Sequence, residues 1–192
     1  GKCICKYKEY SSGCLQDEAP VDLVDNDPIR ANNIHLSIVN GSLDSALKLL
    51  KDSSHDNKEE MEPNYNPIVY KNSTVTFTAL DDAAYNGHIE IVRAISSNLL
   101  DINPHFKGLT PLHHATSNGH LNIVKYFENC IVDKNPKNDK GYGVMYYAVE
   151  WEQLDIVNYY LEILPDEDKN PKVNTSNGHF LGITPIHLIA EK

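Results

Sequence analysis

The spacing of apolar residues changes within one short stretch near the middle of the chain. Leu112 and Ala115 lie three positions apart, so they share one face of a helix. Asn118 and Gly119 follow, and a glycine that adopts a left-handed conformation ends a helix in a sharp turn. The apolar stripe of a second helix comes next, at Leu121, Val124 and Phe127. The stretch therefore predicts two antiparallel helices joined by a tight turn.

Residues at both ends of this stretch support the assignment. Thr110 can accept a hydrogen bond from a free backbone N–H of the first helical turn, and Pro111 is tolerated there because its missing N–H would have no helical partner. Asn135-Pro136 ends the stretch, since proline forces the preceding residue into an extended conformation. Each unit is thus predicted as helix, turn, helix and extended loop.

The same pattern recurs along the chain. The segment that starts at Thr78 repeats the one that starts at Thr110, 32 residues later. Further copies begin at Gly143 and Thr184, and a degenerate early copy contains Ile34. One unit cannot bury the apolar stripes of both its helices, so a period of this length predicts units that stack on their neighbours.

The copies resemble a known repeat family. Thr110-Pro111-Leu112-His113-His114-Ala115, followed by Gly119-His120 and a Leu/Ile/Val run, is similar to the signature of the ankyrin repeat. The resemblance implies an all-α solenoid of stacked antiparallel helix pairs with projecting hairpin-like loops. It also implies a non-catalytic scaffold that binds other proteins through its loop tips and the concave face of its first helices.

The copies suggest how the chain is organised. Residues 1–30 lie outside the repeats and are expected to be a poorly ordered, cysteine-containing extension. Repeats are expected over residues 31–192, as copies at 32–65 (degenerate), 78–107, 110–140, 143–182 (with an insertion) and 184–192 (truncated). The chain starts with glycine and stops inside a copy, so we expect a monomeric stack within a longer protein.

Two spacings between copies are too long for the period. The extra residues fall around 52–71 and around 165–180, in both cases between copies. Insertions there become exposed loops, which are either tolerated surface segments or part of a partner site.

The histidines of the signature could be taken for catalytic or metal-binding residues. The resemblance gives His113 a structural role, with bonds to the neighbouring backbone and threonine, and we extend that interpretation to His88 and His120. Asp81 and Tyr146 stand at the equivalent position of other copies. His113 and His114 are adjacent, so they point to different sides of a helix and cannot readily ligate one metal ion.

Charge and composition narrow the classes of partner. The 192 residues include 17 basic and 27 acidic ones, which gives a net charge of −10. Acidic character repels phosphate backbones, and no basic cluster with interleaved aromatic residues is found. Nucleic acid and anionic membranes are therefore poor candidates. Membrane insertion is not expected either, because the sequence has no apolar run of about 18 residues. Known nucleotide-binding, hydrolase and zinc-protease motifs are missing from the sequence, so we expect no enzyme, cofactor or metal site.

Three cysteines crowd the N-terminus, at Cys3, Cys5 and Cys14. Their spacing is similar to the closing half of an EGF-like module, but the upstream cysteines of such a module are missing. Reduced thiols, a disulfide remnant and a metal site all stay open, and we expect the first. The repeats favour a cytoplasmic or nuclear protein over an extracellular one.

Repeat positions also predict where partners bind. Residues of the first helices and of the loop tips form the candidate surface: Asp82, Tyr85, His105, Phe106, Lys107, His114, Ser117, Asn138, Asp139, Lys140, Tyr147, Glu150 and Trp151. Two alternatives remain. The stack can regulate a larger enzyme or ion channel, or its Asp-x-Asn loops at Asn103 and Asn135 can be substrates of asparagine hydroxylation.

Overall fold

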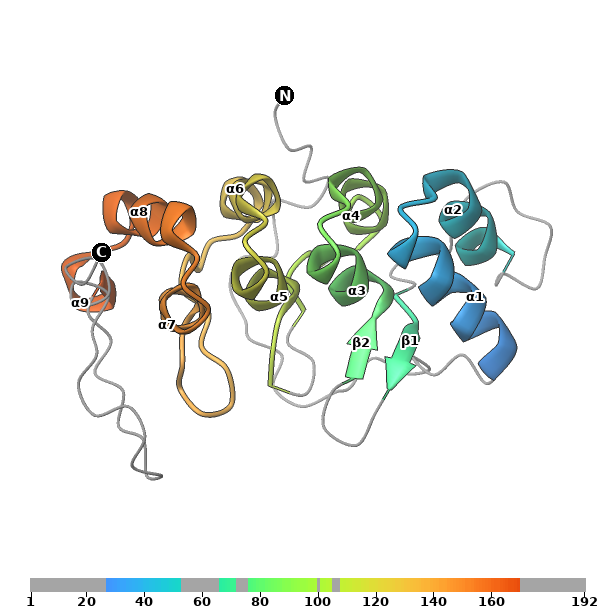
Figure 1. Cartoon of the computed structure of the whole chain (residues 1–192), viewed down its shortest axis with the longest axis horizontal. Helices are drawn as coiled ribbons and strands as arrows, with labels where there is room; N and C mark the ends of the chain where they lie inside the picture. Colours follow the sequence, from blue (N-terminus) through green and yellow to red (C-terminus); the bar gives the residue numbers. More distant parts are fainter. Residues whose placement is uncertain (1–26, 53–65, 72–75, 100, 105–107, 170–192) are drawn as a thin grey trace. The chain divides into compact units, whose positions relative to one another are not determined.

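The computed structural model describes residues 27–52, 66–71, 76–99, 101–104 and 108–169. The chain divides into two compact units, Gly1–Ile102 and Asn103–Lys192, which are described separately here. Both units are built from helix pairs, and each pair consists of a first helix, a tight turn and an antiparallel second helix (Figure 1).

The first unit contains two helix pairs and a small hairpin. Its elements are α1 (Pro28–Val39), α2 (Leu43–Lys51), β1 (Ile68–Lys71), β2 (Thr76–Thr78), α3 (Ala79–Tyr85) and α4 (Ile89–Ser96). The first helices α1 and α3 pack on each other, as do the second helices α2 and α4. The two pairs therefore stack side by side, as the repeat pattern predicts (Figure 1).

Helix α1 begins earlier than the sequence suggests. Its first residue is Pro28, whereas the first copy was expected to start at residue 32. The reason is Asp27, whose side-chain Oδ1 accepts hydrogen bonds from the backbone N–H groups of Ile29 (2.9 Å) and Arg30 (3.3 Å). An aspartate cap followed by proline is a strong helix start, and it adds a turn to this helix.

The hairpin occupies part of the first predicted insertion. Strand β1 pairs antiparallel with β2, and Ile68 lies opposite Thr78, with an irregularity in the register between Ile68 and Tyr70. Strand β2 leads directly into α3 through Thr78, the N-cap of that helix. The part of the insertion that the structure describes thus includes a strand, β1, which contacts α3.

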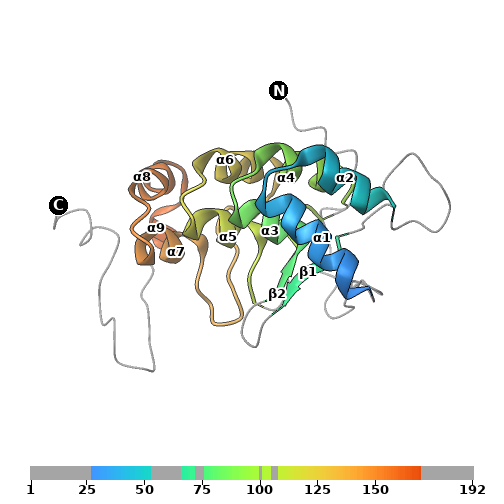
Figure 2. The same ribbon diagram turned by 45° about the vertical axis from the view of Figure 1, so that its right-hand side comes forward.

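The second unit repeats the arrangement. Its helices are α5 (Pro111–Ser117), α6 (Leu121–Cys130), α7 (Val144–Glu150), α8 (Leu154–Ile163) and the short α9 (Asp166–Lys169). Helix α5 packs on α6 and α7, and α8 packs on α6 and α7, so two pairs again stack (Figure 2). Helix α9 falls within the second predicted insertion.

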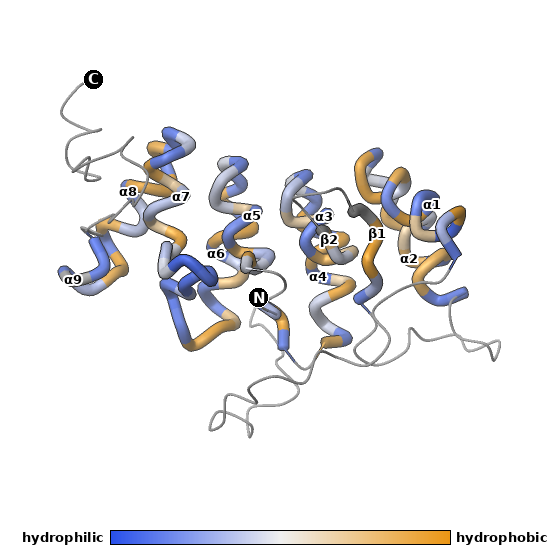
Figure 3. Tube along the Cα trace, turned by 90° about the horizontal axis from the view of Figure 1, so that it is seen from below, coloured by the Kyte–Doolittle hydropathy of each residue, from blue (hydrophilic) through white to orange (hydrophobic). Residues whose placement is uncertain are grey.

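Small residues let the first helices approach their neighbours. The alanine that aligns the copies, at Ala83, Ala115 and Ala148, is fully buried in each pair. The paired helices also carry both apolar and polar residues, as Figure 3 shows by colour. In α6 the buried stripe is Ile123, Val124 and Phe127. Leu121 was expected in that stripe, but it lies in the first turn and is only half-buried.

In each unit, the residue after the second turn bonds to the preceding helix pair. His88 Nε2 lies 3.2 Å from the carbonyl oxygen of Val39, the last residue of α1. Gln153 holds the same place after α7, and its amide donates to the carbonyl oxygen of Ser117 (3.1 Å), the last residue of α5. The structural role predicted for His88 is confirmed, and glutamine fills it equally well.

Candidate functional site

The signature residues at the start of the first helices serve the scaffold. The backbone N–H of Thr110 donates to His113 Nδ1 (3.2 Å), and the Thr110 hydroxyl lies 2.9 Å from the same nitrogen. His113 is buried. These bonds satisfy groups that the first helical turn leaves without helical partners, so the predicted structural role of His113 is confirmed.

Asp81 performs the same task in α3. Its Oδ2 accepts hydrogen bonds from the backbone N–H of Thr78 (3.0 Å) and from the Thr78 hydroxyl (2.8 Å). Burial raises the pKa of Asp81 to about 7, although the bonds from Thr78 pull it down. Loss of the histidine at this position therefore leaves the helix start intact, with a carboxyl group as the acceptor.

Two of the predicted contact residues, Asp82 and His114, are buried rather than exposed. Asp82 Oδ2 lies 2.8 Å from His35 Nδ1, and Asn86 donates to Asp82 Oδ1 (3.0 Å). Burial raises the pKa of Asp82, while His35 opposes that shift. Burial also lowers the pKa of His114 to about 3, so this imidazole is neutral at pH 7. We therefore remove both residues from the candidate surface.

Buried positions of this kind form contacts between neighbouring pairs within a unit. His35 and His113 occupy equivalent positions, because each lies six residues before the turn glycine of its pair, Gly41 and Gly119 respectively. His35 bonds to Asp82 of the following pair, and the ring of His113 meets Tyr147 of the following pair edge-on at 5.1 Å. The position after the signature histidine thus faces the preceding pair, which explains why Asp82 is not available at the surface.

Other predicted residues do reach the surface. Tyr85 and Trp151 are 42% and 59% exposed, which is high for rings of this size, and Glu150 is exposed beside Trp151. Ser117 is half-buried, and its hydroxyl donates to the carbonyl oxygen of His114 (3.1 Å). Tyr147 is half-buried as well. Among the predicted residues of the first helices and their ends, Tyr85, Glu150 and Trp151 are the exposed ones.

The loop before α7 is a hairpin-like turn organised by Asn138. Its Oδ1 accepts from the backbone N–H groups of Lys140 and Tyr142 (both 2.9 Å), and its amide donates to the Tyr147 hydroxyl (2.8 Å). Asn138 therefore holds the loop, whereas its neighbours Asp139 and Lys140 are exposed at the tip. The predicted tip residues His105, Phe106 and Lys107 lie outside the described residues.

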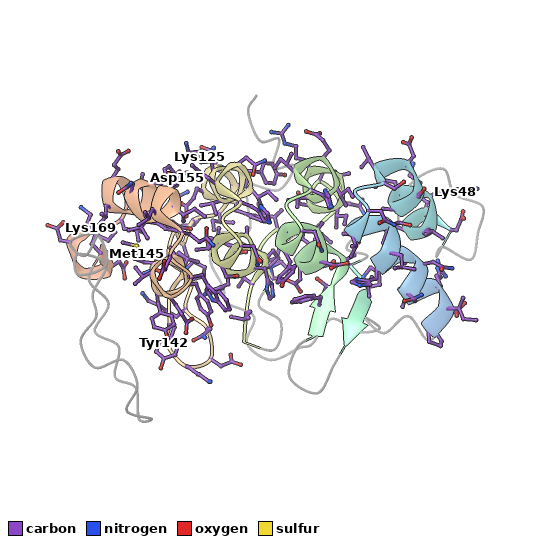
Figure 4. All side chains as sticks on the ribbon, viewed as in Figure 1. Lys48, Lys125, Tyr142, Met145, Asp155 and Lys169 are labelled. Carbon is purple, nitrogen blue, oxygen red and sulfur yellow. The ribbon has the colours of Figure 1, made fainter. Side chains whose placement is uncertain are left out.

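Sequence reasoning missed two aromatic residues beside this loop. The rings of Tyr142 and Tyr146 stack with centroids 4.3 Å apart and planes 20° from parallel. The Tyr146 hydroxyl donates to Glu150 Oε1 (3.1 Å), and burial together with Glu150 raises the pKa of Tyr146 above its ordinary value. Figure 4 shows Tyr142 on the loop that precedes α7. The sequence did offer one signal for these two residues, because Tyr146 replaces the histidine of the signature.

The sequence analysis also did not predict the structural role of the asparagines that precede the loop prolines. Asn66 Oδ1 accepts from the backbone N–H of Leu80 (2.9 Å), and Asn103 Oδ1 accepts from that of Leu112 (3.0 Å). Each asparagine fixes the first turn of the next first helix. Asn135 is buried at the equivalent place, which hinders access of an enzyme to its Cβ, the atom that hydroxylation would modify, in the folded chain.

None of the helices that the structure describes has the length and apolar content needed to span a bilayer.

No curated protein matches the chain. The family description for ankyrin repeats, in three copies, matches residues 80–177, which is about half of the sequence. This match covers α3 to α9, whose paired helices, capping bonds and turn glycines have been described above. The chain belongs to the ankyrin repeat family.

Proposed function

We propose that the chain is a non-catalytic interaction module that binds partner proteins through its first helices and loop tips. Ankyrin repeats are generally modules of this kind. The observation that carries the proposal is the 59% exposure of Trp151, the only tryptophan of the chain, at the end of α7. Tryptophan is enriched among the residues that dominate binding energy, and the interior of this repeat does not use this one.

The candidate surface in the described residues consists of a smaller set than the sequence suggested. On α7 and the loop before it, the set comprises Asn138, Asp139, Lys140, Tyr147, Glu150 and Trp151. Tyr85 and Ser117 end the first helices α3 and α5. His105, Phe106 and Lys107 remain part of the proposal on the basis of their repeat position alone.

Substitution of two aromatic residues tests this surface. We expect Trp151→Ala and Phe106→Ala to weaken capture of partners from cytosolic or nuclear extract, where we propose that the protein resides. The far-ultraviolet circular dichroism of Trp151→Ala should stay unchanged, since this exposed side chain contributes little to folding, and the spectrum of Phe106→Ala is recorded as its own folding control.

Val132→Ala provides a matched control, because Val132 is 87% exposed but lies in the loop after α6. It should bind like the wild type. Partner capture that is unchanged in both aromatic variants would remove this surface from consideration, and specific capture only from secreted material would contradict the proposed location.

A further inference from the structure

The helix pair α7–α8 departs from its neighbours at the start of α7. Gly143 occupies the place of Thr110, so the side-chain cap that Thr110 and His113 form in α5 has no counterpart there. A side chain at position 143 would collide with the amide of Asn135. Tyr146, in the place of His113, directs its hydroxyl along the helix to Glu150 instead of back to the cap.

The end of α7 departs as well. Trp151 replaces Asn118, whose amide donates to the carbonyl oxygen of His114 (2.9 Å) and closes α5. Glu152 replaces Gly119 and takes a left-handed conformation with φ of 53°. Residues that suit the scaffold are thus absent from both ends of one seven-residue helix, and such local conflicts concentrate at functional sites.

Three residues at or beside these substitutions share one chemistry. Tyr142 and Tyr146 present a stacked pair of half-buried rings, and Glu150 adds an exposed carboxylate that the Tyr146 hydroxyl holds in place. The faces of aromatic rings attract cations, and so does the carboxylate. We call Tyr142, Tyr146 and Glu150 the tyrosine–glutamate surface.

We propose that the tyrosine–glutamate surface binds an arginine or lysine side chain presented by a basic segment of a partner protein. The proposal rests on the proposed function and adds the chemistry of the partner. The net charge of −10 attracts such a segment from a distance. Glu152 follows Trp151 and is exposed. Of the two lysines in the loop before α7, Lys137 is paired with Asp168 (2.9 Å) and Lys140 stands next to the exposed Asp139.

An octa-arginine peptide tests this proposal on the full chain. Trp151 is the only tryptophan and follows Glu150, so its fluorescence reports binding nearby, and calorimetry gives the affinity. We expect Glu150→Gln and Tyr146→Ala each to weaken binding by about fivefold, in the range of exposed cation–π and ion-pair contacts. An octa-glutamate peptide should not bind.

Glu162→Gln is the matched control, because it removes the same charge from an exposed position on α8. It should change the affinity less than twofold. If Glu162→Gln weakens binding as much as Glu150→Gln, diffuse charge attraction explains the binding and the proposal is wrong. Glu150→Gln alters only an exposed side chain, so its result does not depend on the folding of Tyr146→Ala.

The proposed function fails in a different way. A partner whose capture is lost in Trp151→Ala but unchanged in Glu150→Gln and Tyr146→Ala would support the interaction module and overturn the basic partner. Capture of a basic partner that falls in all three variants supports both. If none of the three variants changes partner capture or peptide binding, both the interaction module and the basic partner are overturned for this part of the chain.

Discussion

At the scale of single residues, the same backbone positions accept chemically different side chains if one interaction survives. Asp81 and His113 both accept a hydrogen bond from the N–H of the capping threonine, although one is a carboxyl and the other an imidazole. His88 and Gln153 both reach a carbonyl oxygen of the preceding pair. Geometry, rather than residue type, decides whether a substitution is tolerated at these positions.

At Glu152 the backbone conformation is one that a residue with a side chain rarely adopts. Gly41, Gly87 and Gly119 hold the equivalent turns with φ of 66°, 81° and 78°, and Glu152 takes φ of 53° despite its side chain. A non-glycine residue in this region costs about 1 kcal/mol. We therefore expect Glu152→Gly to raise the free energy of unfolding by about 1 kcal/mol in urea titrations.

Gly119→Ala is the reciprocal experiment, and it should destabilise the chain by at least the same amount. A Cβ at position 119 meets the left-handed conformation and also approaches the side-chain amide of Gln153. A Glu152→Gly variant that is less stable than the wild type would show that the glutamate side chain stabilises the turn by more than its backbone costs.

At the scale of elements, each first helix depends on the loop that precedes it. The asparagine before the loop proline accepts a bond from the first turn in two cases, at Asn66 and Asn103. At Asn135 the side-chain oxygen is buried and accepts no hydrogen bond from the residues that the structure describes. The start of α7 therefore lacks both this bond and a side-chain cap.

This difference predicts unequal costs for one substitution made at equivalent places. Asn66→Ala should lower the free energy of unfolding by about 1–3 kcal/mol, because it leaves the N–H of Leu80 without its acceptor. Asn135→Ala should cost at most about 1 kcal/mol, since it removes no bond to the helix start and loses only the hydrogen bond between its side chain and the half-buried Asp168. Urea unfolding of both variants measures the difference; equal costs would contradict the role assigned to Asn66.

At the scale of the whole molecule, buried carboxyl groups set the response of stability to pH. Burial raises the pKa values of Asp81 and Glu128 to about 7, against ordinary values of 3.8 and 4.5, although Lys134 lies 3.6 Å from Glu128. The folded chain therefore binds more protons than the unfolded chain between about pH 4 and pH 7. Their contribution to stability falls as the pH rises through that window.

His114 acts in the opposite direction, because its pKa falls from 6.5 to about 3 on folding. Its contribution is lost as the pH drops below about 6.5, and it offsets part of the gain from the two carboxyl groups. We therefore expect the free energy of unfolding to be about 1–2 kcal/mol higher at pH 6 than at pH 8.

Glu128→Gln isolates one of these groups in urea titrations at the two pH values. The difference between pH 6 and pH 8 should shrink by about 1 kcal/mol, because the variant has no proton to lose at this position. Glu162→Gln, at an exposed position, should leave the difference as it is in the wild type. A pH response that is the same in Glu128→Gln and the wild type would show that Glu128 is ionised throughout.

The sequence by itself determined the repeat, the helix pairs and their turns, because these depend on local chemistry. A capping threonine, a first-turn proline, a small alanine and a turn glycine act within a few residues of their positions, so their order along the chain is sufficient. The structural role of His113 followed from the resemblance to the ankyrin signature and is confirmed.

Only the tertiary structure decided which side chains remain available for a partner. Asp82 and His114 occupy repeat positions expected at the surface, yet both are buried, and Asp82 is bonded to His35 of the neighbouring pair. The ring of His113 likewise meets that of Tyr147 in the following pair, 34 residues along the chain. Burial and contacts such as these depend on residues in another helix pair, more than thirty positions away in the sequence, and no local pattern encodes them.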